Sequence, residues 1–264
     1  MNKIYFCFPG GKHKVLTMSY DDGKQEDRRL VELFNQYGIK GTFHVNSGTT
    51  ANNRIPMSEY KELYKGHEIA CHTLTHPTIA RCPMASVVTE VLEDRINLEK
   101  LIGRPVRGLS YPNGSYSDEI KSMLPTIGIK YSRIVGDSDG FGLPTDLYEW
   151  KATCHHNHNL LQNAEEFVAL SKTQYLYMMY VWGHSYEFTR DDNWELIEKF
   201  CELTGGRDDI WYATNIEYVD YMEMMKGLQF AADNSFVYNP YAASAWISVN
   251  NEIREIKGGE LVML

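Results

Sequence analysis

The fold class is decided by residues 15–45, which read VLTMSYDDGKQEDRRLVELFNQYGIKGTFHV. Residues 15–20 form a short apolar run typical of a buried strand, and 27–37 then carries apolar side chains at helical spacing, including Leu30, Val31 and Phe34. Gly38 is a suitable end for that helix, and 41–45 is the next apolar strand. A strand, a helix and a second strand in this order predict two parallel strands joined by a crossover helix.

The same alternation continues through most of the chain. We expect further strands at 67–71, 106–110, 129–132, 151–155, 176–181 and 210–213, and further helices at 58–64, 84–102, 117–127, 164–170, 194–203 and 214–224. This alternation indicates an α/β fold with a parallel sheet and outer helices, and both a barrel and an open doubly wound sheet fit it. In either architecture, functional groups gather at the carboxyl ends of the strands.

The end of the chain follows a different pattern. Residues 245–249 and 252–256 alternate between apolar and polar side chains, with Asn250 and Asn251 between them, and a Lys-Gly-Gly turn follows at 257–259. This is hairpin chemistry. We therefore predict one domain at 1–227 and a small antiparallel β appendage at 228–264.

Composition limits the classes of partner and compartment. The 264 residues carry a net charge of −9, so we expect neither nucleic-acid binding nor attraction to an anionic membrane. No apolar run is long enough for a membrane span, and the apolar stretch at the N-terminus is too short for a signal peptide. The chain as given is therefore expected to be cytoplasmic, or secreted or cell-wall-associated if a leader was removed. Five cysteines without CxxC spacing argue against a disulfide framework.

Two motifs that follow predicted strands carry the candidate chemistry. Asp21 and Asp22 end the first strand and precede a glycine, where the bending backbone can direct the two carboxylates to different tasks. His72 and His76 follow the strand 67–71, and their i, i+4 spacing lets both imidazoles reach one metal ion. Two imidazoles and one carboxylate form the usual protein ligand set of a catalytic zinc.

Histidines after two later strands add further candidates. Trp182-Gly183-His184 ends the aromatic strand 176–181, and histidine is the side chain best suited to proton transfer near neutral pH. Cys154-His155-His156-Asn157-His158 also resembles a metal-binding run, but a polar loop is the simpler interpretation, with His155 able to border the pocket.

Together these motifs resemble the polysaccharide deacetylase (NodB homology, carbohydrate esterase) family over about residues 15–221. Tyr20-Asp21-Asp22-Gly23 is similar to the aromatic-Asp-Asp-Gly motif of that family, and His72-Thr73-Leu74-Thr75-His76 to its His-Ser/Thr-x-x-His motif. Leu109-Ser110-Tyr111-Pro112-Asn113-Gly114 resembles the third motif, and Trp182-Gly183-His184 stands where the family has Leu-x-His.

The resemblance implies a fold, a cofactor and residue roles. The family fold is a distorted (β/α) barrel of seven to eight strands. A divalent metal, typically zinc, with cobalt, nickel or manganese as other possibilities, is then expected on three residues, Asp22, His72 and His76. Asp21 is the expected general base and His184 the general acid, and the backbone N–H of Asn113 is expected to bind the oxyanion. Tyr111, Pro112 and Trp182 are the expected substrate-binding residues.

Two departures from the family motifs concern the groups that support the acid and the base. Ser110 stands where the family usually has an arginine that orients the catalytic aspartate, and Arg107 lies three residues earlier. The fourth motif, usually Asp-Trp, is also missing. Glu149, followed by Trp150, is a possible remnant of that motif, and Glu187 could instead orient His184.

The leading hypothesis is hydrolysis of an acetyl group from an N-acetylated sugar or polysaccharide. One alternative keeps the fold but acts on an O-acetyl ester or a cyclic amide, and another is a non-catalytic carbohydrate-binding protein. The aspartate pair together with the three histidines favours an enzyme, because a binding protein needs no acid and base. The glycan and the oligomeric state do not follow from the sequence.

Overall fold

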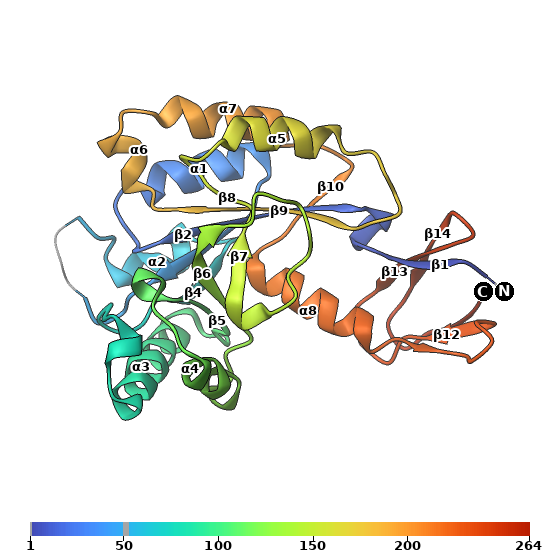
Figure 1. The fold of residues 1–264 in the computed structure, drawn as a ribbon, viewed down its shortest axis with the longest axis horizontal. Coiled ribbons are helices and arrows are strands. Elements are labelled where there is room, and N and C mark those ends of the chain that lie inside the picture. Colours follow the sequence, from blue (N-terminus) through green and yellow to red (C-terminus); the bar gives the residue numbers. More distant parts are fainter. Residues whose placement is uncertain (1, 50–52) are drawn as a thin grey trace.

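The computed structural model describes residues 2–49 and 53–264, and a curved parallel sheet is its centre (Figure 1). Among these residues the sheet has nine strands, in the order β7-β6-β5-β4-β3-β2-β9-β8, with β10 paired to β2. The strands are β2 (Lys14–Asp21), β3 (Gly41–Val45), β4 (Glu68–Cys71), β5 (Gly108–Ser110), β6 (Tyr131–Asp137), β7 (Trp150–Ala152), β8 (Cys154–His155), β9 (Tyr177–Gly183) and β10 (Ile210–Tyr212). The expected α/β class is confirmed.

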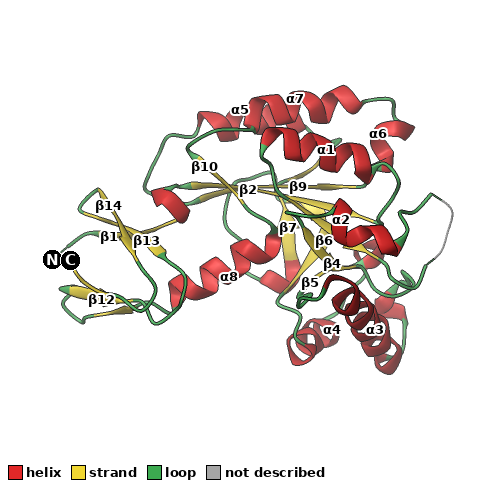
Figure 2. Cartoon of the chain, turned by 180° about the vertical axis from the view of Figure 1, so that it is seen from behind, coloured by secondary structure: helices red, strands yellow, loops and turns green. Residues whose placement is uncertain are grey.

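Helices cover the outside of this sheet on two sides. Figures 1 and 2 place α1, α5 and α7 together on one side and α3 and α4 on the other, while α8 runs from the sheet toward the two chain ends. The helices are α1 (Asp27–Tyr37), α2 (Tyr60–Leu63), α3 (Met84–Ile102), α4 (Asp118–Met123), α5 (Leu160–Ala169), α6 (Tyr186–Arg190), α7 (Trp194–Thr204) and α8 (Asn215–Lys226). None of the helices in the described ranges is both long enough and apolar enough to cross a bilayer.

The sheet curls so far that its two edge strands, β7 and β8, are consecutive along the chain. In the described part, no hydrogen-bonded pairing joins β7 to β8, but only Thr153 separates the end of one from the start of the other. The backbone N–H of Thr153 donates to the carbonyl of Tyr180 on β9 at 2.7 Å. The result is the expected distorted barrel. Its two edges are connected through Thr153 rather than by hydrogen bonds between the edge strands.

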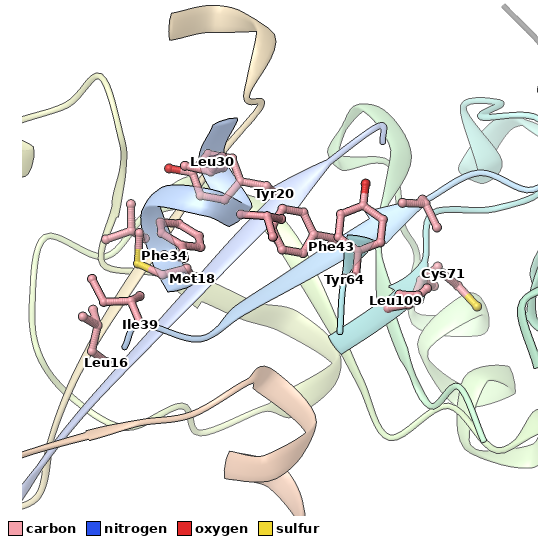
Figure 3. Packing of buried hydrophobic residues seen from close by; sticks show 14 of the residues in the cluster. Leu16, Met18, Tyr20, Leu30, Phe34, Ile39, Phe43, Tyr64, Cys71 and Leu109 are labelled. Atoms are coloured by element: carbon pink, nitrogen blue, oxygen red, sulfur yellow. The ribbon is translucent and has the colours of Figure 1, made fainter. Parts of the chain in front are cut away.

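Strand β2 runs through the centre of the sheet and divides its side chains between two faces. Leu16, Met18 and Tyr20 alternate along the strand and pack, fully buried, among residues such as Leu30 and Phe34 of α1 (Figure 3). The intervening side chains are polar and point into the barrel, as the two-residue period of a strand requires. The buried apolar face holds β2 firmly, and its last residue, Asp21, is therefore placed at the rim of the barrel.

The appendage contains both ends of the chain. Besides the predicted hairpin of β13 (Ala245–Val249) and β14 (Glu252–Ile256), it includes β1 (Ile4–Cys7), which pairs antiparallel with β13. A second small sheet joins β11 (Gln229–Phe230), β12 (Phe236–Tyr238) and β15 (Leu261–Met263). The N-terminal strand thus pairs with the C-terminal strands, an arrangement that the sequence did not predict (Figure 1).

Two elements have other bounds in the structure than the sequence predicted. A proline explains the first difference, and closure of the barrel explains the second. The helix expected at 117–127 ends at Met123 and continues as a 3-10 turn, Leu124–Ile127, because Pro125 has no N–H for a helical hydrogen bond. The strand expected at 151–155 is divided at Thr153, because its two halves belong to opposite edges of the sheet.

Candidate active site

The predicted functional residues lie at one rim because their strands are parallel. Asp21 ends β2, Ser110 ends β5, and His72 and His184 each follow directly after β4 and β9. The neighbouring strands are in register, with Tyr20 beside Gly183 and Cys71 beside Leu109. Segments far apart in the sequence therefore meet at the carboxyl ends of the strands.

Asp22, His72 and His76 offer a set of metal ligands. Each contributes one ligand atom, and these atoms all lie within 4.8 Å of one another. His76 Nε2 is 4.0 Å from Asp22 Oδ1. The donor chemistry, two imidazole nitrogens and a carboxylate oxygen, suits zinc and leaves a position open for water or substrate.

The surroundings of His72 select the tautomer that a metal ligand needs. Its Nδ1 atom lies 2.9 Å from the carbonyl oxygen of Ser110, which can only accept a hydrogen bond. The proton is therefore assigned to Nδ1, and the lone pair of Nε2 faces the other two ligand residues. Burial also lowers the pKa of His72, so the ring stays neutral near pH 7.

The backbone at two ligand positions is left-handed although neither residue is glycine. Asp22 has φ 83° and His76 has φ 64°. Hydrogen bonds hold both conformations, from the Asp22 N–H to the carbonyl of His44 at 2.9 Å and from the His76 N–H to Thr73 Oγ1 at 3.1 Å. Such conformations cost free energy and are concentrated at functional sites.

Arg54 contacts Asp22 directly, and sequence reasoning missed it. Its Nη2 atom lies 3.2 Å from Asp22 Oδ1, and its Nη1 atom donates to the Asp22 carbonyl and, at 2.9 Å, to Asn46 Oδ1. The guanidinium therefore fixes both the backbone and the carboxylate of a ligand residue. A lone arginine in a polar loop gives no sequence signal for this role.

Asp21 is a buried carboxylate with both oxygens occupied. Ser110 Oγ donates to Oδ1 at 3.1 Å, and Arg133 Nη2 donates to Oδ2. Burial raises the pKa of Asp21, but the charge of Arg133 and the nearby histidines together lower it by more than burial raises it. The pKa of Asp21 therefore lies well below its usual range. Asp21 is therefore a carboxylate that stays ionised near pH 7, beside the three candidate ligand residues.

Arg133 is the second residue that sequence reasoning missed. It lies on β6, one residue beyond the strand predicted at 129–132, and it is paired in register with Ser110 of β5. Its side chain is 1% exposed, and its guanidinium also stacks on the ring of Trp182, 4.5 Å from the ring centroid. A charged residue just after a short apolar run is usually a solvated strand end, so no pattern in the sequence distinguishes Arg133.

His184 faces Glu187, as the sequence suggested. His184 Nδ1 lies 3.5 Å from Glu187 Oε1, three residues along at the start of α6. Burial lowers the pKa of His184, but the Glu187 contact and the charges of Asp21 and Asp22 outweigh it, so the pKa is raised above its ordinary value. His184 thus holds a proton more readily than a free imidazole does.

Two further histidines hold Glu187. His155 Nε2 and His156 Nε2 lie 3.0 and 3.2 Å from its Oε2 atom. His155 Nδ1 accepts the backbone N–H of Asn157 at 3.1 Å, so its proton is assigned to Nε2, facing the carboxylate. The pair interpreted as a polar loop from the sequence therefore lies against the carboxylate that faces His184.

The third motif leaves the backbone N–H of Asn113 without a partner among the described residues and buries the side chains of Tyr111 and Pro112. The Asn113 N–H forms no hydrogen bond to another described residue, and its backbone has φ 56°. Asn113 Nδ2 donates to Thr78 Oγ1 at 3.2 Å. Tyr111 is 1% exposed and its hydroxyl donates to the Tyr148 carbonyl at 2.9 Å, and Pro112 is also buried. Both side chains, which the resemblance implies bind substrate, are therefore almost fully covered in the structure.

Trp182 and Glu149 also differ from their expected roles. Trp182 is 7% exposed, donates to Asp137 Oδ1 at 3.0 Å and has one face covered by Arg133, so it supports the site rather than presenting a sugar platform. Glu149 accepts hydrogen bonds from Tyr116 and Lys121 at 2.9 and 2.7 Å. It has no contact with His184, and Glu187 takes the position that Glu149 was suggested to fill.

A curved parallel barrel with an Asp-His-His ligand set beside a buried aspartate defines the class of this site. Residues 9–132 match the model of the polysaccharide deacetylase family. This match confirms the resemblance inferred from the motifs, over the part of the chain that the family model covers.

Curated relatives match part of the chain. A chitooligosaccharide deacetylase from Sinorhizobium fredii is 27% identical over 127 residues, covering 48% of this chain and 54% of the relative. A chitin deacetylase from Arthroderma benhamiae is 26% identical over 128 residues, covering 47% of this chain and 34% of the relative. The matched part thus spans about half or less of the length of these relatives.

A solved structure extends the comparison to the fold. A structure from Mycobacterium smegmatis assigned to the polysaccharide deacetylases superposes with a TM-score of 0.61 at 16% identity, covering 83% of this chain and 93% of that one. This likeness confirms the barrel architecture over most of the chain.

Proposed function

We propose that this protein is a metal-dependent hydrolase that removes the acetyl group from an N-acetylated sugar or polysaccharide. The observation that carries the proposal is the position of Asp21, an ionised and doubly held carboxylate beside the ligand set Asp22, His72 and His76. The names of the curated relatives point to N-acetylated carbohydrate as the substrate class.

The metal site is proposed to hold zinc. Asp22 and the Nε2 atoms of His72 and His76 would be its ligands, and the ion would supply Lewis acidity for hydrolysis of the acetyl group. The His72 tautomer and the mixed nitrogen and oxygen donors support zinc over magnesium or calcium, which prefer oxygen ligands.

The chain's own groups then divide the work between base, oxyanion donor and acid. Asp21 accepts a proton from the water that attacks the acetyl carbon. The Asn113 N–H, which has no other partner among the described residues, donates to the oxygen that gains negative charge. His184, whose Nδ1 faces Glu187, donates a proton from Nε2 to the departing amine nitrogen.

The pairing of His184 with Glu187 favours an amide substrate over an ester. An amine leaves very poorly as an anion, so cleavage of the C–N bond depends on protonation, whereas an alkoxide leaves more readily. The contact with Glu187 raises the pKa of His184 and so favours the protonated ring that this step needs. O-acetyl esters therefore serve as the comparison substrate in the test.

Acetate release with defined substrates tests the proposal. The zinc-loaded protein should release acetate from N-acetylglucosamine oligomers faster than from acetylated xylan, and Asp21→Asn should abolish both activities while retaining zinc. If neither substrate releases acetate with zinc or cobalt bound, the proposed function is wrong. Binding of the oligomers without any turnover would favour a carbohydrate-binding protein.

A further inference from the structure

The carboxylate of Asp21 is contacted by two neighbouring strands at once. Ser110 of β5 and Arg133 of β6 are partners in the parallel pairing of these strands. Ser110 Oγ donates to Asp21 Oδ1 at 3.1 Å, and Arg133 Nη2 donates to the other oxygen, Oδ2. The family usually has an arginine at the position of Ser110. In this chain the Ser110 hydroxyl and the Arg133 guanidinium instead reach Asp21 from two adjacent strands.

The surroundings of Arg133 fix its guanidinium in one orientation. Its Nε atom donates to Ser19 Oγ at 3.1 Å, and its Nη1 atom donates to the Ile134 carbonyl at 3.3 Å. The ring of Trp182 covers one face at 4.5 Å. Hydrogen bonds in the plane and an aromatic ring above it leave the Nη2 edge directed at Asp21, and the planar fork of arginine suits such a site better than lysine does.

The function of this arrangement follows from what a base requires. Asp21 Oδ2 also lies 3.9 Å from His72 Nε2, so rotation of the carboxylate would change its position relative to the ligand set. A misplacement of about 1 Å can cost about a hundredfold in rate. Holding each oxygen by a separate donor prevents that rotation.

We propose that Arg133 is the positioning residue for the catalytic base Asp21, and that it performs from β6 the task that an arginine at position 110 performs from β5 in other members of the family. This inference rests on the proposed function. It makes Trp182 a support for Arg133, which agrees with the burial of that ring.

Relocation of the arginine is the sharpest test. Arg133→Ser should lower kcat for acetate release about a hundredfold, with KM changed less than threefold and zinc still at one ion per chain. The double variant Ser110→Arg, Arg133→Ser returns a guanidinium to the same carboxylate and should recover at least about tenfold of that loss. Arg133→Lys, which keeps the charge but not the fork, should recover less than the double variant.

A matched control separates this effect from general loss of an arginine. Arg107 lies just before β5 and forms a two-point ion pair with Asp220, and it makes no hydrogen bond or ion pair with the described residues of the rim. Arg107→Ser should keep the wild-type kcat. Wild-type kcat in Arg133→Ser would overturn the inference, as would a double variant that binds zinc and folds but is no more active than Arg133→Ser.

Unfolding measurements keep the inference testable if the proposed function fails. In a double-mutant cycle of Asp21→Asn and Arg133→Met, the two losses in melting temperature should be non-additive by a few degrees, because the residues form one buried pair. A wild-type protein without deacetylase activity would refute the function and leave this coupling to be measured. Additive losses would refute the contact itself.

Discussion

Replacing Glu187 with glutamine removes the negative charge that faces His184 Nδ1 at 3.5 Å and keeps the size of the side chain. The contact with Glu187 is one of the causes that raise the pKa of His184 against the effect of burial, so loss of this charge should lower that pKa.

The direction of the pH effect follows from the role of His184 as an acid. The protonated form is the active one, so kcat falls as the pH rises through the pKa of His184 in the complex. The wild-type pKa is raised by Glu187 against the effect of burial. In Glu187→Gln the alkaline limb of the kcat profile should therefore move to lower pH, with little change on its acid side.

The assay is acetate release from N-acetylglucosamine oligomers at saturating substrate, across about pH 5 to pH 9, where histidine titrates. Glu149→Gln is the matched control, because Glu149 is held by Tyr116 and Lys121 and has no contact with His184. The control should retain the wild-type alkaline limb. An unchanged limb in Glu187→Gln would refute the role assigned to this pair.

Three further substitutions test the ligand set, the base and the packing. Zinc at a hundred times its Kd should stabilise the wild type by about 2.7 kcal/mol and leave the melting temperature of Asp22→Ala unchanged; an equal rise in both would remove Asp22 from the ligand set. Asp21→Asn should bind zinc normally in metal analysis and lose about 10²- to 10⁴-fold in kcat, and a variant as active as wild type would show that another group is the base. In Gly183→Ala the new Cβ would lie 2.0 Å from His156 Nδ1, so thermal unfolding should show a loss of about 1–3 kcal/mol; an unchanged melting temperature would contradict this close packing.

The parts of the site that the sequence predicted are those carried by local pattern. Asp21 and Asp22 follow an apolar strand, and His72 and His76 are four residues apart after another, so strand periodicity alone brings them to one rim. Glu187 was also found by local reasoning, because it lies one helical turn beyond His184. Each of these predictions depended on neighbours within a few residues.

The parts that could not be predicted depend on pairing across the sheet. Arg133 of β6 reaches Asp21 of β2, 112 residues away in sequence, only because the sheet curls and brings these non-neighbouring strands to face each other. The pairing of β1 with β13 joins residues separated by more than 200 positions, such as Ile4 and Val249. The periodicity of one segment does not indicate which distant strand it pairs with. Contacts of this kind are therefore seen only in the folded structure.

The same limit applies to the residues expected to bind substrate. Aromatic side chains near strand ends suit both a sugar platform and a core, and the sequence does not distinguish them. Tyr111 and Trp182 are both used for the core, where their polar atoms find partners in the Tyr148 carbonyl and Asp137.

A crystal structure of the protein soaked with zinc, with the ion located by its anomalous scattering, would show directly whether the three residues bind the metal. We expect one ion within about 2.0–2.2 Å of an Asp22 carboxylate oxygen and of the Nε2 atoms of His72 and His76, with Asp21 beside it and still held by Arg133. Zinc bound instead at His155, His156 and Glu187, or no zinc at the rim, would contradict the ligand assignment and the hydrolase mechanism built on it.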